Sequence, residues 1–116
     1  MDITLSALFC VEWEVVKTAD PWAIMSSYNI INGHRASENR DLLENILRDE
    51  WGYRGVVVSD WWTRGEHYKE LLAGNDVKMA TGFPDRVEKA MELGAGTRSD
   101  LERCARRVLE LILKID

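Results

Sequence analysis

The stretch Val56-Val57-Val58-Ser59-Asp60-Trp61 decides the fold class of this 116-residue chain. Three consecutive β-branched residues are typical of a strand that is buried on both faces, as in a parallel sheet covered by helices. The polar pair Ser59-Asp60 follows at the point where such a strand ends. We therefore expect Asp60 to lie at the carboxyl edge of a parallel sheet, where α/β proteins gather their functional groups.

Segments on both sides of this strand alternate between helical and strand patterns. The patterns predict helices over residues 5–19, 38–51, 66–73, 85–93 and 99–114, and strands over residues 22–25, 56–58 and 76–79. Parallel strands need long crossover connections, which helices supply. This order therefore predicts an α/β fold with about three parallel strands, crossover helices and two C-terminal helices.

Individual residues mark the ends of these elements. Asn32-Gly33 is a turn signal, Ser37 is a candidate cap for the next helix, and Gly52 ends that helix. Gly74 is the candidate C-terminal cap of the helix over residues 66–73. The last helix begins with two overlapping capping boxes, Thr97 with Asp100 and Ser99 with Glu102. Its apolar stripe is predicted to be core and consists of Leu101, Cys104, Ala105, Val108, Leu109, Ile112 and Ile115.

Length and charge exclude several classes of function. A chain of 116 residues has room for one core and falls short of the roughly 250 residues of a complete (β/α)₈ barrel. Its 15 Lys and Arg residues against 20 Asp and Glu give a net charge of −5 without a basic stripe, so we expect no nucleic-acid partner. No apolar run has the length of a membrane span, and the start resembles no signal peptide. We therefore expect no membrane partner and, by default, a cytoplasmic location.

Two cysteines and two histidines offer no support for a metal site. Cys10 and Cys104 lie near opposite ends of the chain, and both are expected to be buried, reduced thiols. His34 and His67 are isolated and are interpreted as solvated loop residues. The sequence therefore predicts neither a metal nor any other cofactor.

Asp60 is the candidate catalytic residue. A carboxylate held directly after an apolar strand suits a nucleophile or a general base, whereas the competing interpretation is that Asp60 caps the following turn. Trp61 and Trp62 could offer an apolar face to a sugar or could pack in the core. Tyr28 could direct its hydroxyl at the carboxylate or could be a half-buried packing residue. Asp76 precedes an apolar strand and is expected to be buried against loop amides or to contact a ligand.

Taken together, these motifs resemble glycoside hydrolase family 3. Residues 22–33, which include Met25-Ser26-Ser27-Tyr28-Asn29 and Asn32-Gly33, look like the family's Met-x-Ser-Tyr-Asn and Asn-Gly segment. Residues 56–61 are similar to its Val-Val-Ser-Asp-Trp nucleophile signature, and Ala73-Gly74-Asn75-Asp76 resembles the Ala-Gly-x-Asp that follows. Residues 37–55 look like the helix before the nucleophile strand, and the last helix matches the stretch that closes the barrel domain. The resemblance covers nearly the whole chain from about residue 12.

The resemblance implies a role for each candidate site residue. Asp60 would be the nucleophile of a retaining β-glucosidase-like enzyme, with a second carboxyl about 5–5.5 Å away as acid and base. Tyr28 would hydrogen-bond near Asp60 and the sugar, Met25 would line the same subsite, and Trp61 would stack on the sugar or aglycone. The substrate would be a small β-glycoside or oligosaccharide.

The resemblance also implies that residues 1–116 are a single fragment. They correspond to the C-terminal portion of a TIM-type catalytic barrel, the part that carries the nucleophile. The family's acid/base and its other sugar-holding residues, an Asp, an Arg and a Lys-His pair, have no counterpart in this sequence. We therefore expect the fragment to be inactive alone.

Two functions from other classes stay open at the level of sequence. A small doubly wound module could use Asp60 as a phosphoacceptor with Lys78 as its lysine, although Tyr28 and Asn29 stand where that site needs acids. Alternatively, the chain could be a noncatalytic fragment that associates with itself through an open sheet edge.

Overall fold

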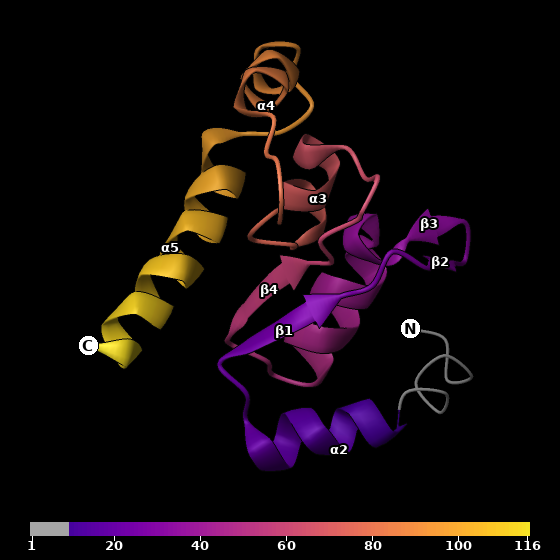
Figure 1. Ribbon diagram of the computed structural model, residues 1–116, viewed down its shortest axis with the longest axis vertical. Helices are drawn as coiled ribbons and strands as arrows, with labels where there is room; N and C mark the ends of the chain where they lie inside the picture. The colour runs from indigo at the N-terminus through magenta and orange to yellow at the C-terminus, as the bar shows by residue number, and fades with distance from the viewer. Residues whose placement is uncertain (1–9) are drawn as a thin grey trace.

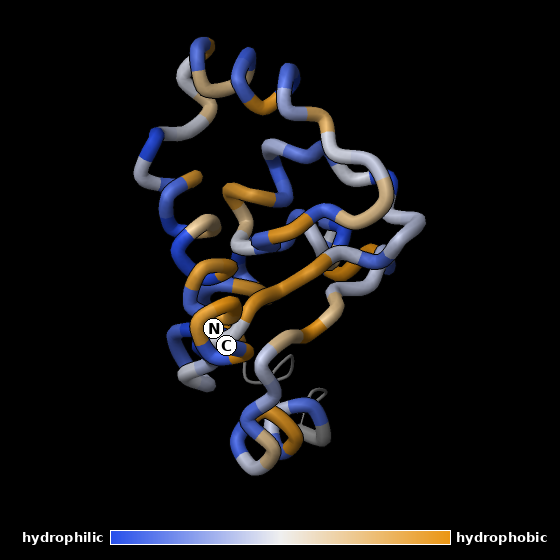
Figure 2. Tube along the Cα trace, turned by 60° about the vertical axis from the view of Figure 1, so that its left-hand side comes forward, coloured by the Kyte–Doolittle hydropathy of each residue, from blue (hydrophilic) through white to orange (hydrophobic). Residues whose placement is uncertain are grey.

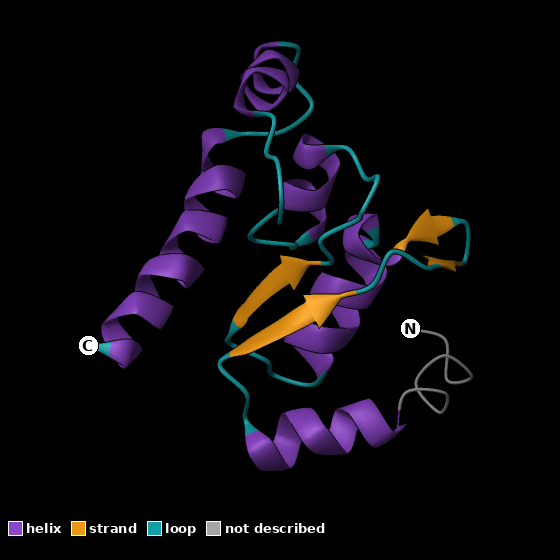
Figure 3. Cartoon of the chain, in the orientation of Figure 1, coloured by secondary structure: helices purple, strands orange, loops and turns teal. Residues whose placement is uncertain are grey.

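The computed structural model describes residues 10–116 and forms a mixed α/β fold with a small parallel sheet. Helices surround the sheet on several sides (Figures 1 and 3). In chain order the elements are α2 (Cys10–Ala19), β1 (Ala23–Ser26), β2 (Ile30–Ile31), β3 (His34–Arg35), the 3₁₀ helix η1 (Ala36–Glu38), the π-helix η2 (Asp41–Glu50), β4 (Val56–Ser59), α3 (His67–Ala73), α4 (Pro84–Glu92) and α5 (Arg98–Ile115). The first part of the helix predicted over residues 5–19 lies outside the described residues.

Strands β1 and β4 pair in parallel, as the sequence predicts. Met25 is the register partner of Val58, and Ser26 is the partner of Ser59. The connection between the two strands contains η2, whose hydrogen bonds include a π-type bond from the Trp51 N–H to the Ile46 carbonyl at 2.9 Å. The crossover places the carboxyl ends of both strands at the same edge of the sheet.

The third predicted strand, over residues 76–79, is reduced to one parallel bridge between Val58 and Val77. The ladder stops because the Met79 N–H donates to the Ser59 hydroxyl at 2.9 Å instead of to a backbone carbonyl. The N–H groups of Asp76 and Val77 both donate to the carbonyl of Val57. The described sheet therefore has two parallel strands and a bridge where the sequence predicts three strands.

The Asn32-Gly33 turn signal is confirmed and belongs to a short hairpin of β2 and β3. Both residues have positive φ, 53° for Asn32 and 83° for Gly33, as the tight turn of a two-residue hairpin requires. The two flanking strands were missed by the sequence patterns, because two residues are too few to show an alternation.

The prediction that Ser37 caps a helix over residues 38–51 is wrong. Ser37 lies inside η1, is fully buried, and donates its hydroxyl hydrogen to the Glu70 carboxylate at 2.8 Å. The Leu42 N–H donates instead to Asn39 Oδ1 at 3.1 Å, so Asn39 supplies the cap. Gly52 and Gly74 end their helices with positive φ, as predicted.

The core lies between the sheet and helices η2, α2 and α3. Its fully buried members include Ile46 and Val57, and the whole cluster consists of Val16, Leu43, Ile46, Leu47, Trp51, Tyr53, Val57 and Ala73. Hydrophobic residues run through the central strands, while hydrophilic and hydrophobic residues alternate along the helices (Figure 2). Burial on both faces of the Val56-Val57 pair confirms the interpretation of the opening stretch.

Helix α5 forms as predicted, but its apolar stripe is mostly not core. Among the seven stripe residues only Cys104 is buried, whereas Leu109, Ile112 and Ile115 are exposed. The helix stands beside the sheet (Figure 1), and its apolar residues toward the C-terminus, Ile112, Leu113 and Ile115, are exposed. Helical periodicity shows which face is apolar but not whether a partner covers it.

Across residues 10–116, none of the helices combines the length and the apolar composition that crossing a membrane requires.

Candidate active site

Asp60 lies directly after β4, at the carboxyl edge of the parallel sheet. Its N–H donates to the Ser26 carbonyl at 3.0 Å, so the β1–β4 ladder continues one residue beyond the last strand pair. Because side chains alternate between the faces of a strand, Asp60 lies on the face of Val58, whose register partner is Met25. The structure therefore places Asp60 and Met25 on the same face at the same edge.

The Asp60 side chain also holds the turn that follows it. Its Oδ1 accepts a hydrogen bond from the Trp62 N–H at 2.9 Å, and its carbonyl accepts one from the Thr63 N–H at 3.3 Å. Within the described residues Oδ2 accepts no hydrogen bond, and the side chain is partly exposed. Turn capping and a chemical role are therefore compatible, because one carboxylate oxygen orients the group while the other stays available.

The remaining candidate residues are at least half exposed, which for Trp61 and Trp62 argues against the alternative that they pack in the core. Of their surface, Met25 exposes 61%, Tyr28 52% and Trp61 54%, and the neighbouring Trp62 exposes 77%. A cavity of about 500 Å³ is lined by Tyr28, Arg35, Trp62 and Arg64, so the end of β1 and the loop after Asp60 meet there. Met25 lines a different cavity, of about 310 Å³, beside α2 and η2.

A buried carboxylate, Glu70, lies beneath the loop that follows Asp60. Its Oε1 accepts hydrogen bonds from the hydroxyls of Ser37 and Thr63, and its Oε2 accepts one from Lys78 Nζ at 3.1 Å. The sequence analysis missed Glu70, because an acid on a short helix is normally solvent-exposed. Lys78 cannot serve Asp60 as the lysine of a phosphoacceptor site, because its ammonium group is bound to Glu70 and to the Gly65 carbonyl.

Asp76 has the structural role that the sequence analysis allowed. Its Oδ2 accepts hydrogen bonds from the Val57 N–H at 2.9 Å and from Arg48 Nη2 at 2.7 Å, and its Oδ1 accepts one from Arg107 Nη1 at 3.0 Å. Burial lowers the pKa of Arg48, and the charge of Asp76 opposes that effect. This cluster connects α5 to η2 and β4 and leaves Asp76 without a free oxygen for a ligand.

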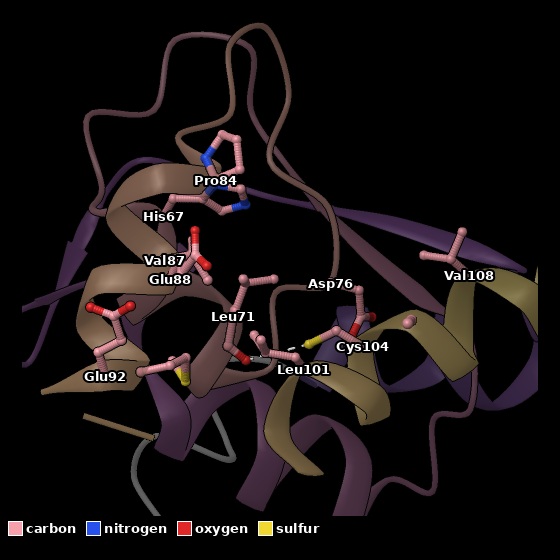
Figure 4. Close-up of a pocket in the computed structure, with 12 residues that line it drawn as sticks. His67, Leu71, Asp76, Pro84, Val87, Glu88, Glu92, Leu101, Cys104 and Val108 are labelled. Carbon is pink, nitrogen blue, oxygen red and sulfur yellow. Dashed lines mark hydrogen bonds between the residues drawn. The ribbon is translucent and has the colours of Figure 1, made fainter. Parts of the chain in front are cut away.

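A second large cavity, of about 660 Å³, lies between α3, α4 and α5 (Figure 4). Its lining is mostly apolar, and its potential nucleophile is the thiol of Cys104. Burial raises the pKa of that thiol to about 12, and the thiol donates to the Leu71 carbonyl at 3.4 Å. Burial also lowers the pKa of His67, whose Nδ1 accepts a hydrogen bond from the Phe83 N–H. The cavity therefore has no activated nucleophile.

No group of three or more His, Cys, Asp or Glu side chains within the described part of the chain could hold a metal ion.

Residues 13–111 match the glycosyl hydrolase family 3 N terminal domain, which is most of the chain. The chain belongs to glycosyl hydrolase family 3. The resemblance drawn from the sequence motifs is thereby confirmed at the level of the family.

Several family 3 relatives are similar in sequence or in structure. Beta-glucosidase A of Butyrivibrio fibrisolvens is 56% identical over 89 residues, which is 77% of this chain and 11% of the relative. An exo-alpha-(1->6)-L-arabinopyranosidase of Bifidobacterium breve is 40% identical over 101 residues, 86% of this chain and 13% of that protein. The crystal structure of a Bifidobacterium adolescentis GH3 beta-glucosidase superposes with a TM-score of 0.85 and 40% identity, covering 91% of this chain and 16% of the other. The family 3 chain thus spans between 11% and 16% of the length of these relatives.

Proposed function

We propose that this chain is the nucleophile-bearing segment of a retaining β-glucosidase and that Asp60 is the nucleophile. The observation that supports the proposal most is the position of Asp60, one residue past β4, with one oxygen bound to the Trp62 N–H and the other uncommitted within the described residues. Similar family members are named beta-glucosidases, which favours a β-glucoside as substrate.

In the proposed mechanism the free oxygen of Asp60 attacks the anomeric carbon. A carbon–oxygen bond forms to the carboxylate while the bond to the leaving oxygen breaks, and a second carboxyl group protonates that leaving oxygen. Water, deprotonated by the same second carboxyl, then hydrolyses the glycosyl-enzyme and restores Asp60. Both displacements invert the anomeric centre, so the product retains the configuration of the substrate.

The second carboxyl is proposed to come from outside this chain. The acids around the loop after Asp60 are engaged elsewhere: Glu38 accepts the Glu66 N–H at 2.6 Å, Glu66 pairs with Arg86 at 3.6 Å, and Glu70 is fully buried. We therefore expect the 116 residues alone to show no glycosidase activity.

Three further residues are proposed to contact the sugar. Met25 shares the sheet face of Asp60, and Tyr28 lines the cavity that Trp62 also lines, which supports their proposed assignment to the subsite around the anomeric carbon. Trp61 is exposed beside Asp60 and is proposed to stack on the sugar or the aglycone.

Residues 1–116 are proposed to form one piece of a (β/α)₈ barrel, its C-terminal portion. The parallel β1–β4 pair, the helical crossover and the bridge at Val77 have the order of consecutive barrel units. An incomplete barrel leaves strand edges without partners, and we propose that the isolated chain associates with itself through such an edge.

Chemical rescue tests the assignment of Asp60. We suggest replacing the matching segment of Butyrivibrio fibrisolvens beta-glucosidase A with this chain and introducing Asp60→Gly into the active chimera. We expect hydrolysis of a dinitrophenyl β-glucoside to fall by roughly 10⁴-fold or more, because the covalent route is lost. Added azide should then restore turnover by occupying the space of the carboxylate and should yield an α-glucosyl azide.

Asp49→Asn provides the matched control, since Asp49 is an exposed acid on η2. An Asp60→Gly variant that retains full activity, or one whose azide product has the β configuration, would contradict the proposal.

A further inference from the structure

The loop of residues 61–66 joins β4 to α3 and sets the surroundings of Asp60. It begins with the two hydrogen bonds that the Trp62 and Thr63 N–H groups donate to Asp60. A displacement of this loop would therefore move the Trp62 amide and, with it, the carboxylate oxygen that the amide holds.

Glu70 of α3 holds this loop at its middle. The Glu70 side chain has no exposed surface, and its Oε1 accepts the Thr63 hydroxyl at 3.0 Å. The same oxygen accepts the hydroxyl of Ser37, which is fully buried in η1, at 2.8 Å. One carboxylate oxygen thus fixes Thr63 against both α3 and η1.

Lys78 holds the loop at a second point. Its Nζ donates to Glu70 Oε2 and to the Gly65 carbonyl, each at 3.1 Å, and its side chain is only 4% exposed. The Gly65 N–H donates to Thr63 Oγ1 at 3.3 Å, which links the two points of attachment. Gly65 has to be glycine for this arrangement, because a methyl group there would overlap the Glu70 carboxylate.

A buried ion pair contributes little net free energy to folding. The cost of removing both charges from water can cancel their attraction, and apolar residues of similar size often serve the fold equally well. Unlike apolar residues, Glu70 and Lys78 form directional hydrogen bonds. These bonds fix two points of a loop that has no regular secondary structure. The Arg48–Asp76–Arg107 cluster, also buried, has no hydrogen bond to this loop.

We propose that Glu70 and Lys78 are positioning residues that orient the Asp60 carboxylate through the loop of residues 61–66. This inference rests on the proposed role of Asp60 as the nucleophile. Neither residue hydrogen-bonds to Asp60, and their effect passes through Thr63 and Gly65 to the Trp62 amide.

The variants Glu70→Gln and Lys78→Met test the proposal in the chimeric β-glucosidase. Glutamine keeps the shape of Glu70 but presents an NH₂ group, a donor, either to the Lys78 ammonium or to the two hydroxyls. The loop therefore loses one of its hydrogen bonds to Glu70. We expect kcat for glycosylation to fall about 10²-fold, as for a small displacement of a reacting group, and KM to change less than about threefold. The double variant, which buries no unpaired charge, should lose less activity than the two single effects combined.

Arg107→Met is the matched control, because it breaks a buried ion pair that does not contact the loop. Hydrogen exchange of the 116-residue chain gives a second readout. We expect Glu70→Gln to accelerate exchange of the amides of residues 62–66 selectively, whereas Arg107→Met should spare them. Equal losses of kcat in both variants, or unchanged loop exchange in Glu70→Gln, would overturn the proposal.

The outcome separates this inference from the function on which it rests. Successful azide rescue of Asp60→Gly together with a Glu70→Gln variant of normal kcat would refute only the positioning role. Failed rescue together with selective loosening of the loop would refute the nucleophile assignment while leaving the mechanical role of the ion pair supported.

Discussion

Gly65 is the residue at which the packing beneath the loop is tightest. Gly65→Ala would place a methyl group against the Glu70 carboxylate, so the ion pair or the loop has to shift. We expect the free energy of unfolding to fall by about 1–3 kcal/mol, as for other overpacked sites. Urea titration of the chain measures the effect. Gly82→Ala is the control, because its methyl would meet only the His67 ring, with Cε1 at 3.2 Å. Equal losses in both variants would contradict this account.

His67 gives the chain a predicted dependence on pH. Burial lowers the pKa of His67 below its ordinary value of 6.5, and protonation would put a hydrogen on Nδ1, the atom that accepts the Phe83 N–H. The unfolded chain therefore binds a proton more readily than the folded chain. The contribution of His67 to stability is complete above about pH 6.5 and is lost as the pH falls below that value.

Replacing His67 by Asn keeps an acceptor near Nδ1 but removes the titration. Urea midpoints at about pH 7.5 and about pH 5.5 should therefore differ more for the original chain than for His67→Asn. His34→Asn, at an exposed position of the hairpin, should retain the original difference. A His67→Asn variant with the same pH dependence as the original chain would count against this role of His67.

The sequence identifies Asp60 as a candidate residue, but it does not identify Glu70, which holds the loop after Asp60. Asp60 stands out because it follows an apolar strand, a pattern that is local. Glu70 has the pattern of an ordinary helix acid, and its burial depends on Ser37, 33 positions away in the chain. Local patterns carry no information on such a contact, so this part of the site required the structure.

At the scale of elements, the N-terminus of α5 offers a direct test of helix capping. The Thr97 N–H donates to Asp100 Oδ2 at 2.8 Å, and this backbone hydrogen bond is the main cause of the lowered pKa of Asp100. We expect Asp100→Ala to cost about 0.5–1 kcal/mol at neutral pH. The loss should vanish in acid, because the contribution of Asp100 exists only above its pKa in the folded chain.

Ser99→Ala is the control for this helix. The sequence predicts a second capping box from Ser99 and Glu102, but the Glu102 carboxylate accepts Arg98 Nε at 2.6 Å instead. Denaturation of both variants should therefore show a loss for Asp100→Ala and almost none for Ser99→Ala. The reverse order would show that the wrong capping box had been assigned.

Elements with a long sequence pattern are predicted correctly. Predictions are wrong where the structure depends on contacts with another element. Ten or more residues of helical periodicity identified α5 within one residue of its bounds and η2 within three residues of its bounds. The strand predicted over residues 76–79 is reduced to a bridge at Val77, and the two-residue strands β2 and β3 are too short to show an alternation. The stripe of α5 was predicted to be core because the helix is amphipathic, but Leu109, Ile112 and Ile115 are exposed in the described part of the chain.

At the scale of the whole molecule, the chain exposes the outer edge of β1. The Trp22 and Ser26 carbonyls accept N–H groups from Val56 and Asp60, so the even-numbered residues of this segment face β4. The N–H groups of Ala23 and Met25 therefore point to the open side of the strand, where no described residue pairs with them. We expect the sedimentation coefficient of the isolated chain to rise with its concentration.

Ala23→Pro should weaken this association without breaking the β1–β4 ladder, because proline removes an N–H that faces outward. Circular dichroism checks that the variant is folded, and sedimentation velocity measures its association. A chain that stays monomeric at all concentrations, or an Ala23→Pro variant that associates as before, would argue against the sheet edge as the contact.

Covalent trapping tests the central claim of this account most directly. The chimeric enzyme is treated with a fluorinated glucosyl fluoride, which forms the glycosyl-enzyme readily but is released from it slowly, and its peptides are analysed by mass spectrometry. We predict that the added sugar is found on Asp60. A label on any other residue, or inactivation without a covalent sugar, would contradict the assignment of Asp60 as the nucleophile.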